Sequence, residues 1–233
     1  MLEDLKERVL QANLDLVRHG LVILTFGNVS GIDRVSGLMA IKPSGVSYEG
    51  MAAQDIVLVD ADGRAVEGRL QPSSDTPTHL ALYKAFPEIG GIAHAHSVEA
   101  TAFAQARLEI PCLGTTHADH FNGPVPITRF LTAKEVETGY ELHTGTVIVD
   151  RFAGLRPLEM PAVLVAGHGP FTWGRTPAEA VQHALILENV AAMARTTLAL
   201  DPRTRPLPAH ILRKHHLRKH GPQAYYGQKK ETS

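Results

Sequence analysis

Apolar positions at the start of the chain follow the spacing of one helix face. Leu2, Leu5, Val9 and Leu16 recur at helical intervals, and Gly20 follows the last of them. Such spacing gathers apolar side chains on one side of a helix, and glycine commonly follows a helix end. The pattern therefore predicts a helix from about residue 2 to residue 19.

Short apolar runs separated by turn residues come next. Runs of this length, bounded by glycine, proline or asparagine, are typical of buried strands. The segments predicted as strands are 21–26, 38–42, 56–60, 91–96, 146–150 and 162–166.

Two further helices are marked by their first residues. Asp75-Thr76-Pro77 and Thr176-Pro177-Ala178-Glu179 each place a capping residue before a proline, which is tolerated in the first helical turn. Helices are expected over about 76–86, 98–107, 132–143 and 177–200, and the polar segment 115–126 is expected to be a loop.

Alternating strands and helices indicate an α/β fold, and the strand-rich early segment favours a mixed or largely antiparallel central sheet flanked by helices. The 233 residues suit a single domain over 1–233. Three prolines within 201–208 interrupt the last long helix, so a C-terminal arm is expected from about residue 209.

Composition narrows the class of protein. Hydrophobic residues make up 44% and the net charge is −1, which allows a sizeable core and disfavours a nucleic-acid binder that works through overall charge. Cys112 is the only cysteine, so no disulfide can form within the chain. The first residues lack a secretory pattern and no apolar run could span a bilayer. We expect a cytoplasmic protein without a membrane or nucleic-acid partner.

The 13 histidines are the compositional feature that needs an explanation. His94 and His96 lie two apart in a predicted strand, so both rings share one face and can supply nitrogen ligands to zinc or another divalent transition metal. A pair of histidines on an edge strand facing solvent explains the same spacing.

Two more residues extend this possible metal site. His168 follows a predicted strand between Gly167 and Gly169, and Asp75 stands at a predicted helix start. A surface turn and an ordinary helix cap explain them equally well. His79, one helical turn beyond Asp75, is a rival ligand.

Serine-containing loops form a second group. Ser44-Gly45 and Ser73-Ser74 follow prolines, and Gly27-Asn28 adds polar groups after a predicted strand. Hydroxyls and backbone N–H groups of this kind can hold a phosphate, although simple turns use the same residues. Neither loop matches a P-loop or a dinucleotide-binding fingerprint.

Candidate proton-transfer groups lie in two places. Asp119 falls in the polar segment 115–120, and Tyr225-Tyr226 lies near the C-terminus. A solvated loop and a flexible tail are the alternatives. Between them runs a basic segment, 210–220, which is typical of a solvated or nucleic-acid-binding face.

Taken in order, several segments resemble the L-ribulose-5-phosphate 4-epimerase family of the class II aldolase/epimerase superfamily. The resemblance runs from the first residues to Tyr225-Tyr226-Gly227-Gln228. Its most specific segments are Gly27-Asn28-Val29-Ser30, Ile41-Lys42-Pro43-Ser44-Gly45-Val46, Pro72-Ser73-Ser74-Asp75-Thr76-Pro77-Thr78-His79, Gly114-Thr115-Thr116-His117-Ala118-Asp119 and Leu217-Arg218-Lys219-His220-Gly221.

The resemblance implies a class II aldolase-like fold and a role for each residue. It makes Asp75, His94, His96 and His168 metal ligands, with zinc the expected ion. Asp119 and Tyr226 become the acid/base pair. It also implies a homotetramer whose sites are shared between subunits and receive the C-terminal arm. The substrate-binding residues it implies are Gly27, Asn28, Ser44, Gly45, Ser73, Ser74, His215 and Arg218.

The implied reaction interconverts L-ribulose 5-phosphate and D-xylulose 5-phosphate in arabinose-type pentose catabolism. The C3–C4 bond breaks in a retro-aldol step, the aldehyde turns, and an aldol step re-forms the bond. The chain departs from the family pattern at Phe26, where tryptophan is usual, and at His120 and His216, where tyrosines are expected.

Two alternatives compete with this interpretation. A product-releasing aldolase of the fuculose-phosphate type shares the histidines and phosphate loops, but carries a glutamate where this chain has Asp75. A non-catalytic metal- or nucleic-acid-binding protein would use the histidines and the basic arm, but leaves the serine loops unexplained.

Overall fold

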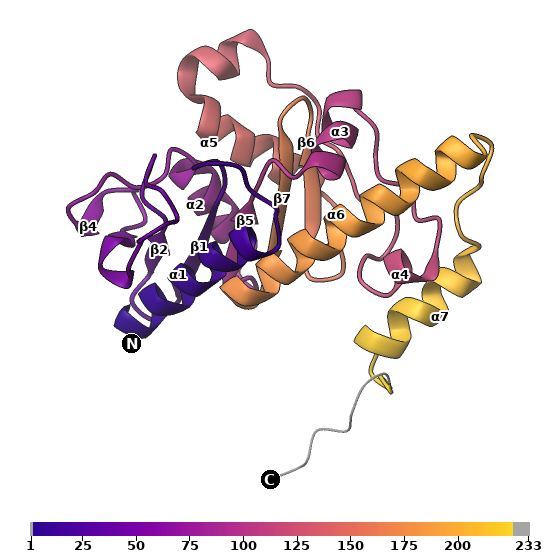
Figure 1. The fold of residues 1–233 in the computed structure, drawn as a ribbon, viewed down its shortest axis with the longest axis horizontal. Coiled ribbons are helices and arrows are strands. Elements are labelled where there is room, and N and C mark those ends of the chain that lie inside the picture. Colours follow the sequence, from indigo (N-terminus) through magenta and orange to yellow (C-terminus); the bar gives the residue numbers. More distant parts are fainter. Residues whose placement is uncertain (1, 226–233) are drawn as a thin grey trace.

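The protein is described by a computed structural model that covers residues 2–225 (Figure 1). Seven strands form one sheet in the order β4-β3-β2-β1-β5-β7-β6, and every strand pairing in it is antiparallel. The expected α/β fold is confirmed, and of the two expected sheet types the structure has the antiparallel one. The strands are β1 (Asn28–Asp33), β2 (Leu38–Ile41), β3 (Val57–Val59), β4 (Ala65–Glu67), β5 (Gly91–His94), β6 (Ala162–Val165) and β7 (Gly169–Gly174).

Helices cover both faces of this sheet. Along β5, successive side chains point to opposite faces, so Ala93 packs in a cluster with α1 (Leu2–Arg18) and α6 (Pro177–Leu200). Ile92 packs in the cluster that holds Leu82 and Tyr83 of α2 (Thr76–Ala85). Figure 1 shows α1 and α6 running across the same face, while α5 (Ala133–Arg151) packs on α2. The central strands are thus buried between two helical layers.

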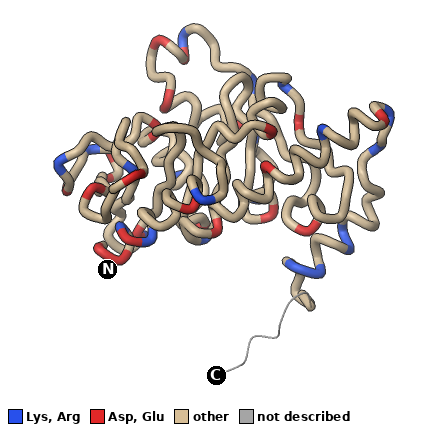
Figure 2. The backbone as a smooth tube through the Cα atoms, viewed as in Figure 1, with Lys and Arg blue, Asp and Glu red and all other residues tan. Residues whose placement is uncertain are grey.

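The remaining helical segments lie at different ends of the sheet. The short 3-10 turn η1 (Ala53–Asp55) contacts α1, whereas α3 (Val98–Ala106) packs on β6 and β7. The last two are α4 (Thr115–Ala118) and α7 (Ala209–His220). In Figure 1, α7 lies beside α4 and away from the sheet. Figure 2 shows Lys and Arg positions recurring along α7, as the basic segment of the sequence implies. Within residues 2–225, no helix is both long enough and apolar enough to cross a bilayer.

Two predicted strands are wrong. Residues 21–26 are irregular, because Leu24 at φ 55° and Gly27 at φ 92° turn the backbone away from an extended path before β1 begins. Residues 146–150 lie inside α5, where Val147 and Ile148 form part of the buried helix face. A short apolar run fits a buried helix as well as a strand, and here the surrounding helix determines the outcome.

Other predictions needed smaller changes. The expected loop at 115–126 begins with the single helical turn α4, and β1, β4 and β7 were not among the predicted strands. β7 starts with Gly169 and Pro170, which are poor strand formers, yet it pairs with both β5 and β6 in the interior of the sheet. Its position therefore depends on its neighbours rather than on its own composition.

Candidate active site

One cavity of about 320 Å³ collects ten of the thirteen site residues expected within residues 2–225. It opens where β1, β5 and the loop before β7 meet the start of α2. Those ten residues are Gly27, Asn28, Ser44, Gly45, Ser73, Ser74, Asp75, His94, His96 and His168, and the cavity is also lined by Thr25, Phe26, Lys42, Pro43, Tyr140 and Glu141.

Three histidines form one wall. His94, His96 and His168 each offer a ring nitrogen, and these nitrogens lie within 4.8 Å of one another. The Nε2 atoms of His94 and His96 are 3.1 Å apart. Two imidazoles on one tetrahedral zinc ion would have nitrogens about 3.3 Å apart, given Zn–N bonds of about 2.0–2.1 Å. The cluster therefore fits a divalent metal ion with little rearrangement.

Two of the three rings are also in the protonation state that metal binding needs. Burial lowers the pKa of His168 to about 4, and the neighbouring His94 and His96 rings lower it further. Partial burial, assisted by His94, also lowers the pKa of His96. Both rings are thus neutral at pH 7, and each keeps a nitrogen lone pair that can bind a metal ion.

His94 is oriented by the backbone. It lies at the end of β5, and its Nδ1 atom is 2.9 Å from the carbonyl oxygen of Pro170 in β7. The carbonyl can only accept, so Nδ1 carries the proton and Nε2 is left as the acceptor that faces His96. The antiparallel pairing of β5 with β7 therefore fixes both the tautomer and the direction of this ring.

Asp75 does not act as the helix cap that its position suggests. It precedes α2, but its side chain makes no capping hydrogen bond. Instead, Asn28 Nδ2 donates to Asp75 Oδ2 over 2.6 Å. Burial raises the pKa of this carboxyl, but His94, His79 and the Asn28 bond outweigh it, so its pKa lies below the usual range.

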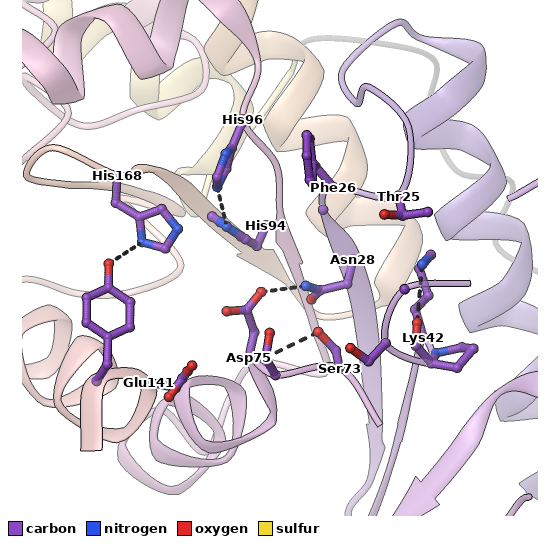
Figure 3. Close-up of a pocket in the computed structure, with 16 residues that line it drawn as sticks. Thr25, Phe26, Asn28, Lys42, Ser73, Asp75, His94, His96, Glu141 and His168 are labelled. Atoms are coloured by element: carbon purple, nitrogen blue, oxygen red, sulfur yellow. Dashed lines mark hydrogen bonds between the residues drawn. The ribbon is translucent and has the colours of Figure 1, made fainter. Parts of the chain in front are cut away.

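The carboxylate of Asp75 is therefore ionised and points toward the histidine side of the cavity (Figure 3). It does not belong to the group whose ligand atoms lie within 4.8 Å of one another, which contains the three histidines alone. The rival His79 is fully buried, and its Nδ1 atom is 2.7 Å from Ser30 Oγ. His79 thus lies behind the cavity wall rather than in it.

The two serine loops lie side by side. Ser44 N donates to Gln71 O over 2.9 Å, and Ser73 N donates to Lys42 O over 3.0 Å. These bonds form an isolated antiparallel bridge between Pro43 and Pro72. Segments about 30 positions apart thereby present Ser44, Gly45, Ser73 and Ser74 to the same cavity.

Lys42 supplies positive charge on this side. Its Nζ donates to Val46 O over 2.7 Å and to Pro43 O over 3.2 Å, and it lies 4.7 Å from the Tyr48 ring centroid. Burial lowers the pKa of this amine to about 8. In Figure 3, Lys42 lies on the side opposite the histidines, with Asn28 and Asp75 between them. The cavity can therefore hold an anion at one end and metal-bound oxygens at the other.

The structure does not bring Asp119, His215 and Arg218 to this cavity. They form a separate cluster, in which Asp119 Oδ1 accepts from His215 Nδ1 at 3.0 Å and from Arg218 Nε at 2.9 Å. Burial raises the pKa of Asp119, but the bonds from Arg218 and His215 outweigh it and hold the pKa low. The fourth residue of this expected group, Tyr226, lies outside the described residues.

Sequence reasoning missed Tyr140 and Glu141, which line the cavity from α5. Nothing in a helical pattern at 132–143 singles out these two positions. The signal that could have found them is Gly139, which breaks the helix just before them at φ 152° and ψ 83°.

Comparisons with known proteins identify the family of the chain. Residues 7–195 match the family described as Class II Aldolase and Adducin N-terminal domain. The chain is 53% identical over 228 residues to the L-ribulose-5-phosphate 4-epimerase UlaF of Salmonella paratyphi B, covering 98% of this chain and 100% of that protein.

Solved structures show the same fold. An L-fuculose 1-phosphate aldolase is 27% identical, with a TM-score of 0.77 over 91% of this chain and 94% of its own. YgbL of Klebsiella pneumoniae is 25% identical, with a TM-score of 0.71 over 91% of this chain and 98% of its own.

Proposed function

The chain belongs to the class II aldolase and adducin family, and we propose that it is a metal-dependent L-ribulose-5-phosphate 4-epimerase. The observation that carries the proposal is the cavity that sets three clustered imidazoles opposite two paired serine loops. A sugar phosphate has oxygens for the first group and a phosphate for the second. The relative of nearly equal length, 53% identical, supplies the particular reaction.

The phosphate end of the substrate binds at the serine loops. Ser44, Ser73 and Ser74 offer hydroxyl donors, and Lys42 adds a positive charge. Hydrogen bonds to a charged group are stronger than neutral ones, so these contacts hold a phosphate that carries two negative charges. Holding it also retains glycolaldehyde phosphate while the C3–C4 bond is open, because that fragment carries the phosphate.

The ketose end binds at the histidines. His94, His96 and His168 hold the divalent ion, Asp75 lies beside them, and zinc is the ion that suits this donor set best. When bound, the ion supplies Lewis-acid stabilisation of the negative charge that develops on the ketose oxygens. Asn28 fixes the Asp75 carboxylate through its 2.6 Å bond, so the charge facing the substrate is held in one place.

The acid/base pair comes from a neighbouring subunit. Epimerisation needs one proton-transfer group on each side of the aldehyde. Beside Asp75, the carboxyl and phenol groups that line the cavity are Glu141 and Tyr140, and both come from α5. We assign the pair to Asp119 and Tyr226 of the next subunit in a homotetramer. Asp119, at the end of α4, is ionised and can accept a proton, and His215 and Arg218 contact it from the arm.

In this scheme, a base removes the C4 hydroxyl proton and the C3–C4 bond breaks to give an enediolate and glycolaldehyde phosphate. The aldehyde rotates about its bond to the phosphate-bearing carbon. The enediolate then attacks its other face, and the acid on that side returns the proton. We place this reaction in pentose catabolism in the cytoplasm.

Product analysis separates this reaction from that of the L-fuculose 1-phosphate aldolase whose fold is similar. The purified protein is incubated with L-ribulose 5-phosphate, and the products are resolved by isomer. The proposal predicts D-xylulose 5-phosphate as the main product. Accumulation of dihydroxyacetone and glycolaldehyde phosphate without xylulose 5-phosphate would identify an aldolase instead.

A further inference from the structure

Helix α5 breaks where it passes the cavity. Gly139 has φ 152° and ψ 83°, a backbone conformation that residues with a side chain rarely adopt. The chain is helical on both sides of it, and the next two residues, Tyr140 and Glu141, line the cavity. The break therefore delivers two side chains to the site that an unbroken helix would not place there.

The segment after the break is anchored. Thr78 Oγ1 in α2 donates to the carbonyl oxygen of Glu141 over 2.6 Å, and Thr144 Oγ1 donates to that of Tyr140 over 2.8 Å. A Cβ at Gly145 would collide with Ala81, so α5 and α2 approach closely there. Tyr140 therefore belongs to a pair of closely packed helices rather than to a free loop.

The Tyr140 hydroxyl contacts His168, a histidine of the cluster whose ring has no backbone partner among the described residues. Tyr140 Oη is 3.4 Å from His168 Nδ1, a bond drawn as a dashed line in Figure 3. His94 has the Pro170 carbonyl at its own Nδ1. Among residues 2–225, Tyr140 is the only hydrogen-bonding partner of the His168 ring, which stands between two glycines.

We propose that Tyr140 is a positioning residue whose phenolic oxygen accepts the Nδ1–H of His168, so that the His168 Nε2 lone pair faces His94 and His96. This inference rests on the metal site of the proposed function. Partners of this kind raise the affinity of a metal site by fixing the tautomer and the ring orientation of a ligand. Burial and the negative charge of Asp75 raise the pKa of Tyr140, so the phenol stays neutral at pH 7.

The test compares Tyr140→Phe with Thr138→Val in the full chain. Tyr140→Phe removes the hydroxyl and keeps the ring, while Thr138→Val removes a hydroxyl of the same helix that contacts Lys134 and His143. Zinc affinity is measured by competition with a chelator. We expect affinity to fall about 10- to 100-fold in Tyr140→Phe, as is typical when a ligand loses its outer partner, and to stay unchanged in Thr138→Val.

A second readout needs neither metal nor activity. In the metal-free wild-type protein, ¹⁵N NMR of the histidine rings should show His168 protonated at Nδ1, and Tyr140→Phe should shift it toward Nε2–H. His168 is assigned from the resonance lost in His168→Asn. An Nε2–H tautomer in the wild type, or unchanged zinc affinity in Tyr140→Phe, overturns the positioning role. Tight zinc binding and the Nδ1–H tautomer without any epimerisation would support the positioning role and reject the proposed reaction.

Discussion

Three side chains at the cavity are each held by a different neighbour, which explains how this part of a small site can be rigid. The Pro170 carbonyl orients His94, Asn28 holds Asp75, and two carbonyl oxygens hold the Lys42 amine. Pre-positioned groups need no reorganisation when charge develops on a substrate. The serine hydroxyls are less constrained, because Ser44 and Ser74 are exposed at the mouth of the cavity.

Ser44 gives the residue-scale prediction. Ser44→Ala removes one donor to the phosphate and leaves the backbone of the loop in place. A hydrogen bond to a charged group is worth roughly 1.5 kcal/mol or more, so KM for L-ribulose 5-phosphate should rise about tenfold. Zinc content should not change, since the metal-binding histidines lie at the other end of the cavity.

Steady-state kinetics of Ser44→Ala and of a control substitution would check this change in KM. Ser36→Ala, in a surface turn after β1, serves as the control and should leave KM unchanged. A KM for Ser44→Ala equal to that of the control would remove Ser44 from the phosphate site.

The sequence alone predicted which residue types make up this site, but it predicted only part of how they group in space. His94 and His96 share a strand face by the alternation of side chains, which any strand imposes. No local rule joins the Ser44 loop to the Ser73 loop, because their bridge is a long-range pairing. Tyr140 was hidden because its position depends on the break at Gly139 rather than on helical spacing.

At the scale of elements, a row of glycines lets α6 approach the sheet. Gly31 of β1, Gly91 of β5 and Gly174 of β7 are paired side by side across three adjacent strands. A Cβ at any of them would collide with Pro177 or Glu179 in the first turn of α6. The capped start of this helix therefore rests directly on the sheet, and β5, which carries His94, lies at the centre of the contact.

Gly91→Ala tests this packing. The added methyl group must displace the backbone at the start of α6, so the free energy of unfolding should fall by about 1–3 kcal/mol, as in other overpacked cores. Gly114→Ala is the matched control, because nothing lies within 4 Å of a Cβ at that position. Urea denaturation compares the two, and equal stability would contradict the close approach.

Elements with strong local signals were predictable, and elements fixed by their neighbours were not. Thr176 before α6 and Pro177 at its first position fixed its start, since Thr176 accepts from the Glu179 N–H as a capping residue should. The apolar run at 146–150 carried strand-forming residues, yet α5 continues through it because Val147 and Ile148 pack into the core as part of a helix. β7 contains glycine and proline and exists because β5 and β6 flank it.

At the scale of the whole molecule, the histidines outside the cavity make folding sensitive to acid. Burial lowers the pKa of His117 to about 4, and burial together with Lys219 lowers that of His120 to about 4. An unfolded histidine titrates near 6.5, so between about pH 6.5 and pH 4 the unfolded chain binds more protons. The free energy of unfolding that depends on these neutral rings is therefore fully present above about pH 6.5, and it declines as the pH falls toward 4.

Urea unfolding at several pH values measures this effect. Each such histidine should lower the free energy of unfolding by about 1 kcal/mol between pH 7 and pH 5.5. His120→Gln should lose part of this pH dependence, because the substituted side chain does not titrate. The same slope in both proteins would show that His120 does not contribute.

Sharing of sites between subunits is a further whole-molecule prediction. His96→Ala removes a metal ligand and Tyr226→Phe removes an acid/base hydroxyl, so each protein alone should be nearly inactive. In tetramers mixed from equal amounts, a site needs an intact metal set from one subunit and an intact arm from another. With random assembly, each of these two parts is intact in about half of the cases, so roughly a quarter of the sites have both.

Activity of the mixed tetramers after subunit exchange is the measurement. Recovery to roughly a quarter of the wild-type rate fits sites built between subunits. If mixing restores nothing while exchange is complete by native mass spectrometry, each site lies within one subunit.

The most direct test of the central claim is a metal titration of the stripped protein, with D-xylulose 5-phosphate formation from L-ribulose 5-phosphate as the readout. The His94, His96 and His168 cluster predicts that epimerisation is absent without zinc, rises linearly and stops rising at one ion per subunit. His96→Ala should fold normally, since its ring is exposed, and should show no such rise. Full epimerisation by the stripped protein, or by His96→Ala without added metal, would contradict the account.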